Sequence, residues 1–219
     1  MNTILFALEI IGTITFAVSG VITAFAKKLD ILGAIVLGTA TAVGGGILRD
    51  ITLGYLPPSA FRNPVYAITA IITSVIIFVL AYFLGDNIKS HFGLYSQIIN
   101  IFDSIGLAVF TVAGVNSAFE HGFGGNAFLT IFVAFLTGVG GGALRDIMAG
   151  NVPKILRKRI YALAVIIGAA IYYTLINFNL CPDIPAVIIG AGSVLIIRIL
   201  ATIFHWNLPR IKNLSDLEK

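Results

Sequence analysis

Apolar residues run along this chain in long blocks separated by short polar segments, the pattern of a protein that crosses a membrane repeatedly. Seven blocks have the length of about 20 residues that an α-helix needs to span a hydrocarbon core of about 30 Å. They cover approximately residues 5–25, 32–53, 64–84, 98–119, 127–148, 160–178 and 186–204. The pattern therefore predicts one transmembrane domain over residues 1–205, followed by a tail at residues 206–219.

Composition supports this reading, because 58% of the residues are hydrophobic, only 11% are charged and the mean hydropathy is +1.00. Such values lie outside the range of soluble globular domains. The amino terminus lacks the basic region and cleavage site of a secretory signal, so the first block is expected to remain as a span. Cys181 is the one cysteine, which excludes an intramolecular disulfide.

The loops between the blocks differ strongly in positive charge, which predicts the orientation of the chain. The loops of one side and the tail contain Lys27, Lys28, Lys89, Lys154, Arg157, Lys158, Arg159, Arg210, Lys212 and Lys219. The other side contains only Arg62. Because basic loops stay in the cytoplasm, we expect the amino terminus outside and the carboxyl terminus inside, in a cell (inner) membrane. This distribution explains the pI near 9.3 better than nucleic-acid binding does.

The chain also contains an internal repeat. Residues 43–51 (VGGGILRDI) return as residues 139–147 (VGGGALRDI), identical at eight of nine positions. Upstream, Glu9 corresponds to Asp103 and Phe16 to Phe110. Each repeat, about 5–84 and about 98–178, holds three spans, and an odd number of crossings inverts the second repeat relative to the first. An all-α fold of two inverted three-helix repeats plus a seventh helix, at about 186–204, is therefore predicted, an architecture typical of transporters and channels.

Three consecutive glycines lie within the second and fifth spans: Gly44, Gly45 and Gly46, and Gly140, Gly141 and Gly142. Each destabilises a helix by about 1 kcal/mol relative to alanine, so another interaction must offset them. One interpretation is that the helices bend or unwind here and line a polar pathway with backbone groups. The alternative is close packing of helices through small residues. Placement in two inverted spans favours the first.

The ionisable residues within the spans are Glu9, Arg49, Asp50, Asp103, Arg145, Asp146 and Arg198. Burying each costs about 2.5–3.5 kcal/mol on insertion scales, so such residues usually face a bundle interior or a watery path. Adjacent helix positions point about 100° apart, so Arg49 is not expected to neutralise Asp50. The same holds for Arg145 and Asp146.

Partners on other helices are predicted from depth in the membrane. Glu9 and Arg49 lie near the same end of their spans, and so do Asp103 and Arg145, which makes two symmetry-related candidate pairs. Arg198 is placed to reach Asp103 or Asp146. These charges could flank a pathway, or they could be purely structural ion pairs.

Other motifs carry little chemistry. His91, His121 and His205 are scattered without ligand spacing, so a metal site is not expected. No nucleophile and base are paired in the sequence and no cofactor motif is present, so the chain is not expected to be an enzyme. The glycine-rich residues 122–126 are interpreted as a turn. The basic residues 154–159 are expected to enforce topology and to contact anionic lipids.

At the two GGGxLRD segments within this layout, the sequence resembles the prokaryotic trimeric intracellular cation channel (TRIC) family, from about Glu9 to Phe204. The resemblance implies a homotrimer with one pore per protomer, between the repeats, that passes monovalent cations, chiefly potassium. It also implies that the six glycines are kink residues. Arg49, Asp50, Arg145 and Asp146 would flank the path. The Lys-Glu-Val motif of eukaryotic members is absent, so their lipid regulation is not transferred.

Two other functions remain open from the sequence. Related bacterial sequences carry the label of glycine transporter, and inverted repeats suit a small-solute transporter as well as a channel. A non-conducting scaffold is the third possibility, and it predicts fully paired charges with a dry glycine zone.

Overall fold

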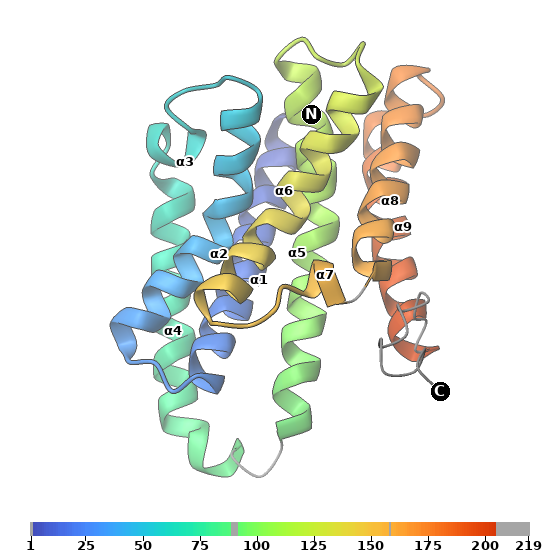
Figure 1. Cartoon of the computed structure of the whole chain (residues 1–219). Helices are drawn as coiled ribbons and strands as arrows, with labels where there is room; N and C mark the ends of the chain where they lie inside the picture. The colour runs from blue at the N-terminus through green and yellow to red at the C-terminus, as the bar shows by residue number, and fades with distance from the viewer. Residues whose placement is uncertain (1, 89–91, 158, 205–219) are drawn as a thin grey trace, which may run out of the picture.

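The computed structural model describes residues 2–88, 92–157 and 159–204, which form α-helices joined by short loops (Figure 1). The helices are α1 (Asn2–Ala26), α2 (Ile31–Thr52), α3 (Ser59–Arg62), α4 (Val65–Ile88), α5 (Phe92–Glu120), α6 (Ala127–Met148), α7 (Lys154–Arg157), α8 (Arg159–Asn177) and α9 (Asp183–Ile203). Seven of them are long and apolar enough to span a membrane, which confirms the predicted spans. The tail predicted at residues 206–219 lies outside the described residues.

The two repeats have matching packing. Helices α1, α2 and α4 contact one another in the first repeat, and α5, α6 and α8 do so in the second. Helices α1 and α5 run in opposite directions, as inversion requires (Figure 1). The repeats meet where α2 lies against α6 and α1 against α5, while α9 covers α8 and α5. The inverted three-plus-three-plus-one arrangement is therefore confirmed.

Equivalent helices also begin and end in the same way. The side chains of Asp30 and Asn126 accept hydrogen bonds from the third residue beyond them, at 2.7 and 3.1 Å, and so cap α2 and α6. Both helices end in a left-handed glycine, Gly54 (φ 72°) and Gly150 (φ 66°), which satisfies the terminal carbonyls. These turns lead into the short helices α3 and α7, which the hydropathy pattern does not reveal.

The glycine triplets lie where α2 crosses α6. A Cβ atom on Gly45 would collide with the backbone carbonyl of Thr137, and one on Gly141 would collide with that of Thr41. Both helices are continuous through the glycines, so the unwinding considered from the sequence is not observed. Close backbone approach, the alternative interpretation, is observed at Gly45 and Gly141, and bending of the helices at the glycines stays a prediction.

Two phenylalanines fill the space between the repeats at this level. Phe16 and Phe110 occupy equivalent positions, and their ring centroids lie 5.2 Å apart. Each ring packs on a glycine of the opposite repeat: Phe16 on Gly106, and Phe110 on Gly12, where a Cβ would lie 3.0 Å from the ring. Phe16 is fully buried. The helix crossing and this aromatic pair thus form a tightly packed centre.

Candidate functional site: two inverted charge clusters

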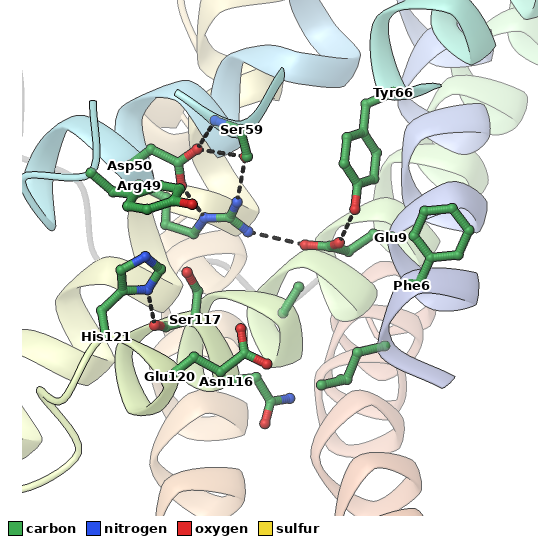
Figure 2. Close-up of a pocket in the computed structure, with 13 residues that line it drawn as sticks. Phe6, Glu9, Arg49, Asp50, Ser59, Tyr66, Asn116, Ser117, Glu120 and His121 are labelled. Atoms are coloured by element: carbon green, nitrogen blue, oxygen red, sulfur yellow. Dashed lines mark hydrogen bonds and ion pairs between the residues drawn. The ribbon is translucent and has the colours of Figure 1, made fainter. Parts of the chain in front are cut away.

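The first charge cluster lies near the carboxyl end of α2 and is centred on Arg49 (Figure 2). The Arg49 guanidinium donates to Glu9 at 3.1 Å, to Asp50 at 2.8 Å and to the Ser59 hydroxyl at 3.0 Å. Asp50 also accepts from the Ser59 backbone N–H at 2.6 Å, and Tyr66 donates to Glu9 at 2.6 Å. Four helices therefore contribute side chains to one network.

The second charge cluster is the inverted copy, near the carboxyl end of α6. Arg145 donates to Asp103 at 2.7 Å and to Asp146 at 2.8 Å, and it also contacts the Ser19 hydroxyl of the first repeat. The backbone N–H of Lys154 donates to Asp146 at 2.9 Å, as Ser59 does to Asp50. The predicted pairs Glu9–Arg49 and Asp103–Arg145 are thus both confirmed.

The third predicted contact is also present, because Arg198 of α9 lies 3.9 Å from Asp103. Its guanidinium stands over the ring of Tyr161, 4.7 Å from the centroid. Of the two partners proposed for Arg198, the ion pair is with Asp103.

One prediction was wrong. Arg49 pairs with its neighbour Asp50, and Arg145 pairs with Asp146, each at 2.8 Å. The Cβ atoms of adjacent residues do point about 100° apart. However, the long arginine side chain bends back around the helix, and the aspartate, held by the first backbone N–H of the short helix that follows, stays within its reach.

The two clusters differ in charge. The first joins Arg49 to Glu9 and Asp50, whereas the second sets Arg145, Lys154 and Arg198 against two aspartates. One of the two extra cations is Lys154 of α7, which takes the place of Ser59 of α3, and the other is Arg198 of α9, which lies outside the repeats. Its ammonium lies 3.1 Å from the Asn100 side-chain oxygen and 3.6 Å from Asp103. Burial lowers the pKa of Lys154 to about 8, although the negative charge of Asp103 opposes part of this shift.

The clusters also differ in access. A cavity of about 360 Å³, here named the vestibule, opens beside the first cluster and is lined by residues of α1 to α5, with Glu9, Arg49 and Asp50 on one side and Ser117 and Glu120 on the other (Figure 2). The Glu9 side chain is 21% exposed. In contrast, the side chains of Arg145 and Asp103 are completely buried. Only one of these two equivalent pairs is therefore open to its surroundings.

The last glycine of each triplet faces one of these clusters. Gly46 lines a small pocket with Glu9 and Arg49, and a Cβ on it would meet open space apart from Arg49 at 4.0 Å. A Cβ on Gly142 would lie 2.9 Å from the Tyr161 hydroxyl and 3.3 Å from Asp103. The absence of a side chain on Gly142 thus leaves space for the buried second cluster.

Several site residues were missed by sequence reasoning, namely Ser59, Tyr66, Glu120, Lys154 as a partner of Asp103, and Tyr161. The tyrosines carried a usable signal, because Tyr66 follows Arg49 at nearly the same spacing as Tyr161 follows Arg145. Ser59 and Lys154 carried none, since the short helices that place them are set by the turns after α2 and α6.

Comparison with known proteins gives consistent matches across the chain. The family model described as "Glycine transporter" matches residues 6–82 and 100–177, which are the two repeats. The UPF0126 inner membrane protein YadS of Escherichia coli (strain K12) is 37% identical over 202 residues, covering 92% of this chain and 93% of that protein.

Solved structures give the same result. A structure from a study of conductance through TRIC cation channels is 37% identical, with a TM-score of 0.78, covering 94% of this chain and 96% of the other. The TRIC trimeric intracellular cation channel orthologue from Rhodobacter sphaeroides has a TM-score of 0.83 at 29% identity, covering 93% of this chain and all of that one.

Proposed function

The chain belongs to the glycine transporter family and, by its fold and sequence, to the prokaryotic TRIC channels, and from this premise we propose that it conducts monovalent cations, chiefly potassium. The observation that carries the proposal is the charge of the vestibule between the repeats. Its lining contains the carboxylates of Glu9, Asp50 and Glu120 but only the guanidinium of Arg49 to balance them. Clefts lined by one sign of charge concentrate the opposite ion at their mouth. A cation entering there would meet the first charge cluster.

The proposed pathway continues between the repeats. From the vestibule it would pass Phe16, Phe110 and the α2–α6 crossing, and it would leave beside the second charge cluster. An opening motion would therefore have to separate the helices at this packed centre before ions could pass. Glycines at the crossing would permit that motion because no side chain links the two backbones. The six glycines and the charges Glu9, Arg49, Asp50, Asp103, Arg145, Asp146 and Arg198 are accordingly proposed to frame the path.

The proposed assembly is a trimer of identical protomers. Solved relatives are trimeric by name, and α4 presents Ile68, Ile72 and Ile76 on the outside of the protomer, a face suited to lipid or to another protomer. We take the protein to be a homotrimer in a cell inner membrane, with one pore in each protomer. The basic loops would place the vestibule outside and the second cluster in the cytoplasm.

Glycine transport is the second candidate, favoured by the description of the matching family. A transporter holds its solute at a closed centre and exposes it to each side in turn. A cavity on one side of a tightly packed centre, as here, is compatible with one state of such a cycle.

A planar-bilayer recording of the purified protein under a potassium gradient separates the two functions. A channel gives discrete current steps that reverse near the potassium equilibrium potential. A transporter gives no such steps but takes up labelled glycine into proteoliposomes with saturation. Silence in the bilayer together with saturable glycine uptake would overturn the proposal. Empty liposomes and bilayers serve as controls in both measurements.

A further inference from the structure

One carboxylate of the vestibule, that of Glu120, is not neutralised by Arg49, the arginine that lines the same cavity. Glu9 and Asp50 are both bound by Arg49. Glu120, at the end of α5, lines the same cavity and is exposed, and within the described part of the chain it forms no ion pair. A negative charge is therefore available to an incoming ligand.

A carboxylate ligand finds no comparable partner there. All three nitrogens of the Arg49 guanidinium already donate, to Asp50, Glu9 and Ser59. The Tyr66 hydroxyl donates to Glu9. The charge of Arg49 is thus already offset by Glu9 and Asp50, so an amino-acid carboxylate would meet an excess of negative charge, whereas a cation would not. The vestibule thus selects for positive charge.

A second polar group points to a ligand independently of the charge. Ser117 is only 6% exposed, yet it lines the vestibule, and its hydroxyl makes no hydrogen bond with any of the described residues. Ser117 and Glu120 are three residues apart on α5 and so share one face of the helix. Figure 2 shows both side chains directed into the space in front of Arg49 and Glu9. The hydroxyl of this largely buried residue therefore has its hydrogen-bonding capacity free for a ligand in the cavity.

The amino-terminal end of α1 adds an apolar wall to the vestibule. Leu5 and Phe6 line the cavity, and the Phe6 ring packs edge-on against Tyr66 with centroids 6.0 Å apart. The volume of about 360 Å³ far exceeds the roughly 30 Å³ that one water molecule occupies in the liquid. The cavity therefore has room for an organic group beside this apolar wall.

From these contacts we propose that the vestibule is a binding site for a small organic ammonium ion. Its charged head lies between Glu120 and Ser117, and its apolar part lies against Leu5 and Phe6. The bound ion obstructs the mouth of the ion pathway, a consequence that rests on the proposed channel function. The binding itself does not depend on conduction.

Calorimetric titration of the purified full-length protein in detergent, at constant ionic strength, tests the binding. The probe is n-butylammonium chloride, and its uncharged counterpart n-butanol is the control ligand. We expect saturable binding of butylammonium and none of butanol. Glu120→Gln should weaken binding about tenfold, because it removes the opposite charge, and Ser117→Ala about threefold, because it removes a hydroxyl acceptor. Asp183→Asn is the matched control, because it removes a carboxylate at the same end of the bundle but outside the vestibule (Figure 1).

Several results would overturn the site. Absence of saturable binding, equal binding of butanol, or unchanged affinity in both Glu120→Gln and Ser117→Ala would each do so, provided that the variants unfold at the wild-type temperature. Competition by potassium chloride at the same concentration as butylammonium would identify an inorganic cation site instead.

The bilayer assay separates this proposal from the proposed function. Butylammonium added on the vestibule side should reduce the potassium current of the wild type and have much less effect on Glu120→Gln. A protein that binds butylammonium but never conducts leaves the site standing and refutes the channel. A protein that conducts but neither binds butylammonium nor is blocked by it refutes the site alone.

Discussion

Tyr66 and Tyr161 occupy equivalent positions in the two repeats, but only Tyr66 uses its hydroxyl, which donates to Glu9 at 2.6 Å. The Tyr161 hydroxyl is buried and has no hydrogen-bond partner among the described residues, and the same is true of Asp103 Oδ2. The inverted repeats thus share a charge network without sharing every bond in it.

This difference predicts opposite outcomes for the same substitution. Tyr66→Phe should lower the free energy of unfolding by about 1.5 kcal/mol, because a hydrogen bond to a carboxylate is lost. Tyr161→Phe should be close to neutral, since the atom it removes has no partner. Thermal unfolding of both variants in the same detergent checks this, and an equal loss in both would contradict it.

The Asp103–Arg145 pair should show the stronger coupling of the two predicted ion pairs. Both of its side chains are fully buried, whereas Glu9 of the other pair is 21% exposed. Removing one member of a buried pair commonly costs about 3–5 kcal/mol, because the remaining buried charge loses its nearest partner. Arg145→Ala should therefore be strongly destabilising, and adding Asp103→Ala should recover part of the loss.

A double-mutant cycle measures that recovery, with the Arg49→Ala and Glu9→Ala cycle run in parallel. Access to the vestibule should make the coupling smaller in the parallel cycle. Strict additivity in both cycles would show that the pairs contribute no interaction energy.

The close approach of α2 and α6 at Gly45 predicts that an added side chain there destabilises the protein. The direction of this change in stability distinguishes close packing from helix bending. Gly45→Ala should lower the unfolding temperature, because its Cβ would push the Thr137 carbonyl and separate α2 from α6. Gly192→Ala on α9 is the matched control, since a Cβ there meets open space, and it should be neutral or stabilising by up to about 1 kcal/mol from helix propensity. If Gly45→Ala were also stabilising, the close-approach explanation would be wrong.

Lys154 should make stability depend on pH. Burial lowers its pKa from an ordinary value of 10.5 to about 8 in the folded protein. Between these values the unfolded chain holds a proton that the folded protein has released, so stability should rise with pH across this window. The charged groups around Lys154 are Asp103, Asp146, Arg145 and Arg198, and their effect is included in this shift.

Unfolding temperatures of the wild type and Lys154→Met, measured across that window, isolate the effect from other lysines. The rise should be smaller in the variant. Identical pH profiles for the two proteins would show that Lys154 titrates normally. If the protein conducts, loss of this positive charge should also increase potassium current as the pH on that side rises.

The loop charges predict that the carboxyl terminus is cytoplasmic and the amino terminus outside. A carboxyl-terminal alkaline phosphatase fusion, which is active only outside the cytoplasm, should therefore be inactive, and a fluorescent protein fusion that folds in the cytoplasm should be bright. Active phosphatase at that end would reverse the assignment, and the vestibule would then face the cytoplasm.

By itself, the sequence determined the membrane spans, the inversion and the two principal ion pairs. Hydropathy is a local property of about 20 residues, so each span can be identified without its neighbours. Inversion follows from counting crossings between two copies of one motif. Glu9 with Arg49 and Asp103 with Arg145 followed because residues at equal depth in adjacent spans can meet.

Only the tertiary structure decided how these parts fit together. Glycines permit bending and close packing alike, and the difference lies in whether another backbone passes through the space that a Cβ would fill, as Thr137 does at Gly45. The pairing of Arg49 with Asp50 depends on how a flexible side chain bends, which helix periodicity does not describe. The cavity beside the first cluster depends on how loops and helices from both repeats meet, and that is a property of the assembled fold rather than of any segment.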